Sequence, residues 1–270
     1  MSSISTFFTS LLAEAIGLPA TAFDRFFDAD QQHKLKIVKY PEAPTDSDDP
    51  RDRQGVGPHK DSMLTSYLLQ ASDQPGLQAQ NTAGQWVDCA PIPGTLVVAI
   101  GQGMEALTGG VCASTTHRVL SPKRGQGPRY SIPFFQGVSY DARFEEMDVP
   151  EEVRELRRAK GQRKDDVEFA FVKGRWGHLG EATLFNRVRS HPDVGERWVS
   201  STSAYGAVDF SVDSAANFDD SIQSCWPRYV RSRRRRRRRL NNRVEWYAGL
   251  VDARATCHLL TSECLRVRIG

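Results

Sequence analysis

Two histidines and an aspartate are the residues whose types and spacing best suit chemistry. His59 and Asp61 are separated by one residue, and His117 follows 56 residues (117 − 61) after Asp61. Residues i and i+2 of an extended strand point to the same side, so His59 and Asp61 can hold one ion. Two imidazoles and a carboxylate hold a non-haem Fe(II) on one face and leave the opposite positions open. His117 must then lie on a strand that is adjacent in space, which an antiparallel barrel provides.

A basic and a hydroxyl side chain follow the second histidine. Arg129 lies 12 residues (129 − 117) after His117, and Ser131 is two residues further on. This spacing again places two side chains on one face of a strand. A guanidinium binds a carboxylate through two parallel hydrogen bonds, and a hydroxyl can add a third. The pattern predicts a carboxylate clamp beside the metal site, as a 2-oxo acid co-substrate requires.

These residues belong to a longer pattern of seven ordered segments. The segments are 36–41 (KIVKYP), 55–61 (GVGPHKD), 76–81 (GLQAQN), 84–87 (GQWV), 93–98 (PGTLVV), 116–119 (THRV) and 129–135 (RYSIPFF). Together they make the stretch from about Lys34 to Trp198 resemble the Fe(II)/2-oxoglutarate-dependent dioxygenases of the isopenicillin N synthase-like superfamily.

The resemblance implies a site and a set of cofactors. The iron ligands would be His59, Asp61 and His117, and the 2-oxoglutarate contacts would come from Arg129, Ser131 and Tyr40. The cofactors would be Fe(2+) with 2-oxoglutarate and O2 as co-substrates, and no catalytic residue is implied beyond the metal centre. The reaction would be hydroxylation, desaturation or ring closure of a small organic molecule such as a secondary metabolite.

The chain departs from the family pattern in two respects. The family commonly has Asn where Val38 and Ala99 stand here, so weaker support around the metal ligands is expected. Family members also usually carry on the order of a hundred residues ahead of the first helix, which cover the barrel. Because this chain lacks the usual N-terminal region, apolar barrel surface is expected to be exposed.

Hydrophobic periodicity and turn residues predict a mainly β fold, and the resemblance implies a double-stranded β-helix (jelly roll) with flanking helices. The predicted strands cover 35–40, 63–70, 76–80, 86–89, 95–100, 115–120 and 129–136. The predicted helices cover 3–17, 22–27, 102–107, 150–160 and 180–190. Residues 41–56 are expected to form a solvent loop that could cover the mouth of the site.

Three regions are predicted along the chain. Residues 1–165 form the jelly-roll domain with its N-terminal helix, 166–198 a helical extension packed on the barrel, and 199–270 a low-complexity, disordered tail. The tail contains a cluster of eight arginines, Arg231 and 233–239. Without them the net charge of +3 becomes −5 (3 − 8), so the remaining surface is not a basic surface for nucleic acid.

Composition favours a cytoplasmic protein. The five cysteines form no CxxC pair and are odd in number, which argues against a disulfide framework or a zinc site. No stretch has the roughly 20 apolar residues of a membrane span. Three alternatives stay open: a superfamily oxidase that uses no 2-oxo acid, a catalytically impaired remnant, and a nucleic-acid-binding protein acting through its arginine cluster. The oligomeric state is left open.

Overall fold

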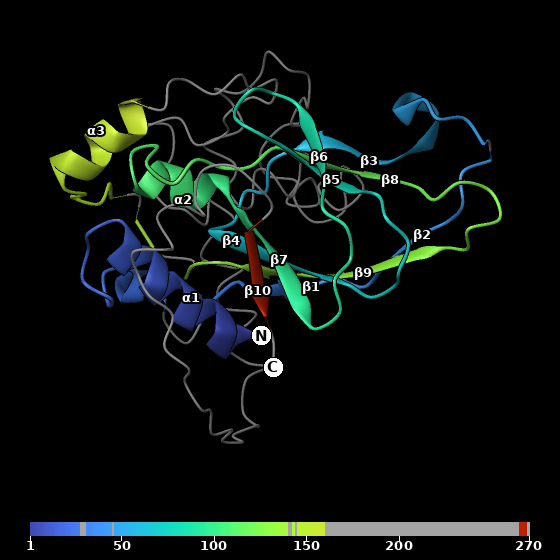
Figure 1. Cartoon of the computed structure of the whole chain (residues 1–270). Coiled ribbons are helices and arrows are strands. Elements are labelled where there is room, and N and C mark those ends of the chain that lie inside the picture. Colours follow the sequence, from blue (N-terminus) through green and yellow to red (C-terminus); the bar gives the residue numbers. More distant parts are fainter. Residues whose placement is uncertain (28–30, 45, 140–141, 144, 160–264, 269–270) are drawn as a thin grey trace, which may run out of the picture.

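The strands form two antiparallel sheets (Figure 1). The computed structural model describes residues 1–27, 31–44, 46–139, 142–143, 145–159 and 265–268. The large sheet has the order β1-β9-β4-β7-β10, with β2 also paired to β9, and the small sheet has the order β3-β8-β5-β6. The large sheet contains β1 (Lys34–Leu35), β2 (Val38–Tyr40), β4 (Thr65–Gln70), β7 (Thr95–Ile100), β9 (Arg129–Gln136) and β10 (Leu265–Arg268). The small sheet contains β3 (Gln54–His59), β5 (Leu77–Gln80), β6 (Trp86–Asp88) and β8 (His117–Leu120).

The path of the chain between these sheets is that of a double-stranded β-helix. From β2 to β9 the chain passes from the large sheet to the small sheet and back three times, with β5 and β6 forming a hairpin within the small sheet. Strands that are remote in sequence therefore become neighbours, as the sequence predicted for the two histidines. The mainly β, jelly-roll prediction is confirmed.

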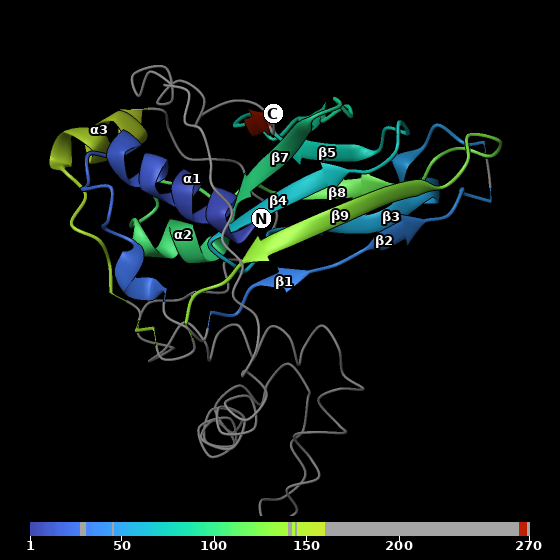
Figure 2. The ribbon, with the colours of Figure 1, turned by 90° about the horizontal axis from the view of Figure 1, so that it is seen from below.

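The three α-helices of the described residues lie toward one end of the two sheets (Figures 1 and 2). They are α1 (Ser2–Ala15), α2 (Gln102–Leu107) and α3 (Glu151–Ala159), and two short 3-10 helices span Asp24–Phe26 and Pro50–Arg53. Within the described part of the chain, no helix is long and apolar enough to cross a membrane.

Alternate residues of the large sheet contribute to two different cores. Tyr67 and Val98 belong to the core under α1, where the Phe8 ring meets the Tyr67 ring edge-on at 5.9 Å. Leu68 and Val97 belong instead to the smaller core between the two sheets. This alternation follows from the two-residue period of a strand, and it fixes which side chains face the interior of the barrel.

A buried polar network also joins α1 to the large sheet. Gln136 Nε2 donates to Thr9 Oγ1 at 2.9 Å, and Gln136 Oε1 accepts from Thr65 Oγ1 at 2.5 Å. Gln136 and Thr65 are both fully buried, so these bonds satisfy polar groups that would otherwise be costly inside the core.

The predicted strand over 35–40 is two short strands in one register. Leu35 lies opposite Phe134, and Val38 lies opposite Ser131. Between these pairs the chain faces Pro133, which has no N–H to donate to the ladder. Pro133 of β9 therefore explains why β1 and β2 are two strands instead of one.

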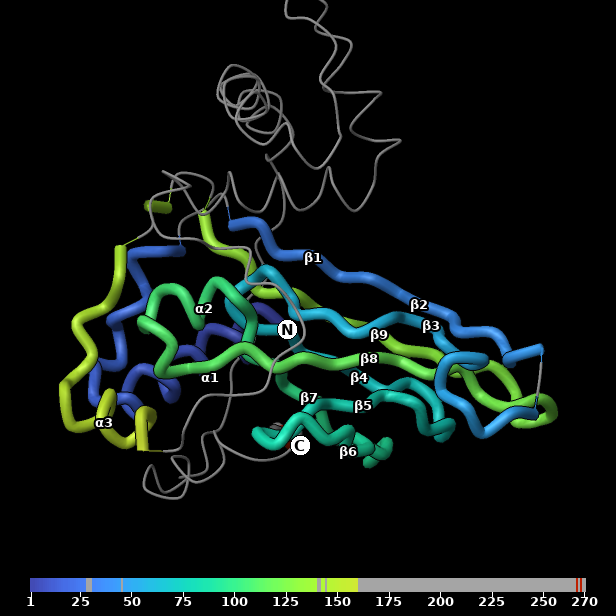
Figure 3. Tube along the Cα trace, turned by 90° about the horizontal axis from the view of Figure 1, so that it is seen from above, coloured from blue at the N-terminus to red at the C-terminus, as the bar shows by residue number. Residues whose placement is uncertain are grey.

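The loop before β3 docks on the turn between β8 and β9, at the end of the sheets away from the helices (Figure 3). The Glu42 carboxylate accepts hydrogen bonds from Gly125 N, at 3.1 Å, and from Gly127 N. These contacts directly follow Tyr40 in the chain and directly precede Arg129. The segment predicted as a solvent loop thus holds this end of the barrel together, and its last residues form β3.

The carboxyl-terminal residues differ from the predicted tail. Leu265–Arg268 form β10, which pairs with β7 along its outer edge, and Arg266 Nη2 donates to Ala90 O at 2.8 Å. Leu-Arg-Val-Arg alternates apolar and charged residues, as a strand does. The pattern is only four residues long and lies in the arginine-rich region, so no strand was predicted there. The predicted helix over 180–190, the extension over 166–198 and the arginine cluster lie outside the described residues.

Removal of residues 265–270 should expose the edge of β7. An unpaired strand edge is a template for pairing with another chain, so we expect concentration-dependent self-association. Light scattering after size-exclusion chromatography would measure it, with Arg266→Ala as the control that loses only the bond to Ala90. A shortened chain that stays as monodisperse as the full chain would contradict a protective role for β10.

Candidate metal centre

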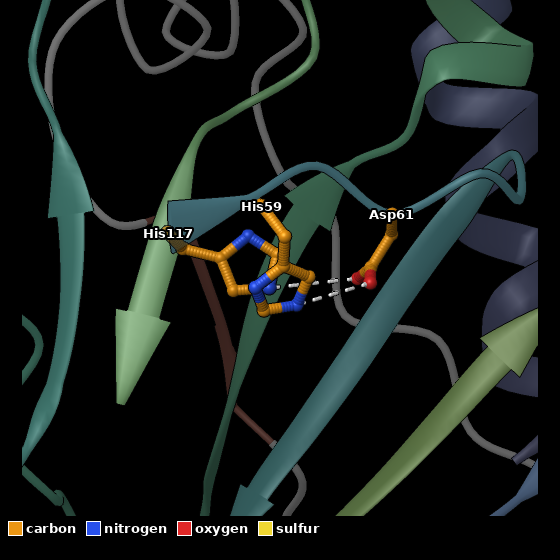
Figure 4. Close-up of side chains that lie close together, drawn as sticks. All are labelled: His59, Asp61 and His117. Atoms are coloured by element: carbon orange, nitrogen blue, oxygen red, sulfur yellow. Dashed lines mark ion pairs between the residues drawn. The ribbon is translucent and has the colours of Figure 1, made fainter. Parts of the chain in front are cut away.

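The two histidines are brought together by strand pairing. His59 ends β3, His117 begins β8, and the two residues are register partners in the small sheet. Asp61 follows β3 by two residues. Nε2 of His59 lies 3.7 Å from Asp61 Oδ1, and Nε2 of His117 lies 3.7 Å from Asp61 Oδ2 (Figure 4). One potential ligand atom from each residue thus falls within 4.8 Å of the other two, so all three point to one place.

The hydrogen-bond partner of Nδ1 determines which nitrogen of each imidazole carries the proton. His59 Nδ1 lies 2.9 Å from Gly57 O, and His117 Nδ1 lies 3.0 Å from Thr115 O. A carbonyl only accepts, so Nδ1 carries the proton and Nε2 keeps its lone pair for a metal ion. Burial lowers the pKa of His59, and the neighbouring His117 acts in the same direction. Both effects favour the neutral imidazole that binds metals.

Asp61 is held by neighbours on both sides. Ser66 Oγ donates to Asp61 Oδ2, and the Asp61 carbonyl accepts from Gln102 N, at the start of α2, at 2.7 Å. A side chain at Gly101 would place its Cβ 1.9 Å from Met63 O, so only glycine lets α2 approach this loop. The aspartate is therefore positioned by a strand and a helix together.

Lys60 points away from the triad, as the strand period predicts. Its side chain is buried, and Nζ lies 3.9 Å from Glu105 Oε2 on α2. Glu105 also accepts from Ser114 N at 2.9 Å. The residue between the two ligands thus links the ligand loop to α2.

The predicted clamp residues form a second group in the barrel. Arg129 is only 1% exposed, and its guanidinium carbon lies 5.2 Å from the centre of the Tyr40 ring. Tyr40 and Val38 of β2 lie opposite Arg129 and Ser131 of β9. Ser131 is also buried, and its Oγ is 3.5 Å from Leu69 O, at the limit of a hydrogen bond.

The described residues leave the Arg129 guanidinium incompletely satisfied. Its Nη2 donates to Gln70 Oε1 at 3.1 Å, whereas Nε and Nη1 have no partner among the described residues. Burial lowers the pKa of Arg129 and raises the pKa of Tyr40. A buried cation with open N–H groups is costly unless an anion binds it. This is the arrangement expected of a carboxylate-binding site.

Two neighbours of these groups were not identified from the sequence. Ser66 contacts the triad and Gln70 contacts the clamp, and both lie on β4. The sequence predicted a strand over 63–70 but assigned no role to its polar side chains. The available signal was the even spacing of its polar residues on one face, at positions 66 and 70.

Comparisons with known proteins agree with this geometry. The family model described as the 2OG-Fe(II) oxygenase superfamily matches residues 31–138. The 2-oxoglutarate-dependent dioxygenase frbJ of Dothideomycetidae sp. (strain 11243) is 69% identical over 202 residues, covering 73% of this chain and 55% of that protein. A 2-oxoglutarate-dependent dioxygenase of Gibberella zeae is 34% identical over 202 residues, covering 71% of this chain and 52% of that protein. The chain spans about half the length of these curated relatives.

A solved structure supports the same assignment. A putative 2OG-Fe(II) oxygenase family protein from Caulobacter crescentus is 28% identical, with a TM-score of 0.50, over 67% of this chain and 52% of that one. The chain belongs to the 2OG-Fe(II) oxygenase superfamily, whose members use Fe(2+), 2-oxoglutarate and O2.

Replacing Ser66 with alanine should weaken metal binding. The hydroxyl donates to a carboxylate of the triad, and loss of such a supporting contact typically reduces metal affinity roughly 10- to 100-fold. Titration of the metal-free protein with Fe(II) under anaerobic conditions would measure the change. Ser72→Ala is the matched control, because its hydroxyl accepts from Tyr130 N beyond the end of β4. Equal affinities of the two variants would contradict a supporting role for Ser66.

Proposed function

We propose that this chain is the catalytic part of an Fe(II)- and 2-oxoglutarate-dependent dioxygenase that oxidises a small organic molecule. The observation that carries this proposal is the pair of complementary groups inside one barrel. A three-residue triad suits a cation, and the incompletely satisfied guanidinium of Arg129 suits a carboxylate.

The triad residues fit Fe(II). Two neutral imidazole nitrogens and one carboxylate are the facial ligand set of non-haem Fe(II) oxygenases, which leaves other coordination positions for small molecules. His59, Asp61 and His117 would hold the ion. The hydrogen bonds at the two Nδ1 atoms prepare the correct tautomers before a metal arrives.

The clamp residues fit 2-oxoglutarate. Ser66 and Gln70 are four residues apart on one face of β4, so the triad end and the clamp end are separated by roughly 13 Å along the strand. An iron ion, a small dicarboxylate and the Arg129 side chain would together span this interval. Arg129 would bind the carboxylate far from the metal, with Ser131 as an additional donor and the Tyr40 ring beside the guanidinium.

The protein's part in the reaction is binding and placement. Bound Fe(II), with 2-oxoglutarate and O2, supplies the chemistry that oxidises a C–H bond. Arg129 and Ser131 hold the co-substrate in one direction, and burial of this end of the barrel excludes water from their hydrogen bonds. The barrel then has to hold the right C–H bond of the substrate close to the metal centre.

An oxidase that uses no 2-oxo acid is the principal alternative within the same fold. In such an enzyme the buried guanidinium of Arg129 would have to bind a carboxylate of the substrate itself. Binding of 2-oxoglutarate therefore distinguishes the two reactions. Nucleic-acid binding would depend on the arginine cluster, which lies outside the described residues.

Each triad residue should be necessary for iron. We expect one Fe(II) per chain in the unmodified protein and loss of the bound iron in His59→Ala, Asp61→Ala and His117→Ala, because three ligands leave no spare donor. Elemental analysis of the purified proteins measures this directly. His33→Ala is the control, since His33 contacts Phe134 and Gly137 instead of the triad. Undiminished iron in His117→Ala would remove that residue from the proposed site.

Arg129 should be necessary for 2-oxoglutarate but dispensable for iron. A charge-assisted hydrogen bond contributes about 1.5–3 kcal/mol, so Arg129→Ala should weaken 2-oxoglutarate binding at least roughly tenfold. Anaerobic titration of the Fe(II) protein, followed by its visible charge-transfer absorption, would give the affinity. Arg118→Ala is the control, because that guanidinium packs on Trp86 and bonds Gln78. Absence of the absorption in the unmodified protein would favour the oxidase alternative.

A further inference from the structure

We infer that Gln70 is a positioning residue that orients Arg129 toward the carboxylate of the co-substrate. This inference rests on the proposed function, and it assigns a role to a side chain outside the predicted metal and co-substrate residues. The neutral amide of Gln70, held in one orientation, lies beside the buried guanidinium of Arg129, which keeps N–H groups open for a ligand.

The strand register brings the two side chains together. Gln70 is the last residue of β4, and its partner across the ladder is Ser131 of β9. Arg129 lies two residues before Ser131, so it is the diagonal neighbour on the same face. Gln70 Oε1 accepts from Arg129 Nη2 at 3.1 Å. The position of Gln70 therefore depends on the central pairing of the large sheet.

The orientation of the Gln70 amide is determined by a second partner. Its Nε2 donates to Cys89 O at 2.9 Å, and a carbonyl can only accept. The amide nitrogen must therefore face Cys89, and the amide oxygen must face Arg129. A flipped amide would place Nε2 against Nη2 of Arg129, so that two hydrogen-bond donors would face each other.

Gln70 and Tyr40 contact different parts of the guanidinium. The Tyr40 ring centre lies 5.2 Å from the guanidinium carbon, while Gln70 Oε1 holds Nη2. The donors left over are Nε and Nη1, which have no partner among the described residues. A ligand carboxylate would therefore meet N–H groups that already have a defined direction.

Gln70 is uncharged, so it does not compete with a ligand carboxylate for Arg129. A carboxylate at this position would form an ion pair with Arg129 and compete with the ligand for the same cation. An amide oxygen accepts one hydrogen bond and leaves the full positive charge for the ligand. The side chain thus orients the guanidinium without neutralising it.

The test compares two substitutions and two ligands. Gln70→Met keeps a similar side-chain volume and removes the hydrogen bonds, whereas Gln70→Glu keeps the shape and adds a competing charge. Each Fe(II)-loaded protein is titrated anaerobically with 2-oxoglutarate and with 2-oxobutanoate, a 2-oxo acid that lacks the far carboxylate. Iron affinity and thermal unfolding are measured on the same samples.

We expect Gln70→Met to lose about tenfold in affinity for 2-oxoglutarate, the size of one hydrogen bond to a charged group. Gln70→Glu should lose more, and the affinities of both variants for Fe(II) and for 2-oxobutanoate should stay unchanged. In an Arg129→Ala background, Gln70→Met should cause no further loss, because Gln70 acts through Arg129. Gln78→Met is the matched control, since it removes another glutamine–arginine bond, to Arg118 Nε, in the small sheet.

The outcomes separate this inference from the proposed function. Equal 2-oxoglutarate affinities of the unmodified and Gln70→Met proteins would overturn only the role of Gln70. A parallel loss for both ligands, an additive loss in the Arg129→Ala background, or failure of both Gln70 variants to fold would also overturn it in favour of a structural role. An unmodified protein that binds Fe(II) but no 2-oxoglutarate would overturn the proposed function as well.

Discussion

The alternation of side chains along β4 is the constraint on which both the core and the candidate site depend. Thr65 and Tyr67 face α1 and hold it through Gln136 and Phe8. Ser66 and Gln70, on the opposite face, contact Asp61 and Arg129. A register slip of one residue would exchange the two faces, so the helix contacts and the site contacts specify the same register. Because β4 lies between β9 and β7, few slipped arrangements could satisfy both sets.

The support around the metal ligands comes from an unexpected strand. The family pattern predicts weaker order around the metal ligands, because Ala99 stands where the family commonly has Asn. In the structure, Ser66 is the register partner of Ala99, and its hydroxyl donates to Asp61. The Ser66 hydroxyl on β4 thus contacts the Asp61 carboxylate, next to Ala99 on β7, which has no polar side chain. A single chain gives no sign of this arrangement, because only the pairing register places residues 66 and 99 side by side.

Local patterns in the sequence predicted most of the fold, whereas features that depend on a partner strand were missed. The bounds of β7, β9 and α2 agree with the predicted ranges, since each is a run with a clear period and flanking turn residues. The split of 35–40 depends on Pro133, and β10 depends on the free edge of β7. The pairs His59/Asp61 and Arg129/Ser131 have a local two-residue spacing that a sequence can reveal, and their roles stay predictions. Ser66 and Gln70 contact these groups only across strands. The domain boundaries and the cytoplasmic location stay predictions.

Charge complementarity explains why one ligand could join the two ends of the site. The triad end contains the carboxylate of Asp61 and needs a cation, while the clamp end contains the guanidinium of Arg129 and needs an anion. Among the described residues, Asp61 accepts a hydrogen bond from Ser66, whereas Arg129 keeps buried N–H groups without a partner, which is costly. A metal ion with a dicarboxylate would satisfy both at once, and binding that is restricted to the folded chain stabilises it by mass action. On the proposed function, the open N–H groups of Arg129 would therefore select a ligand that carries a carboxylate away from the metal.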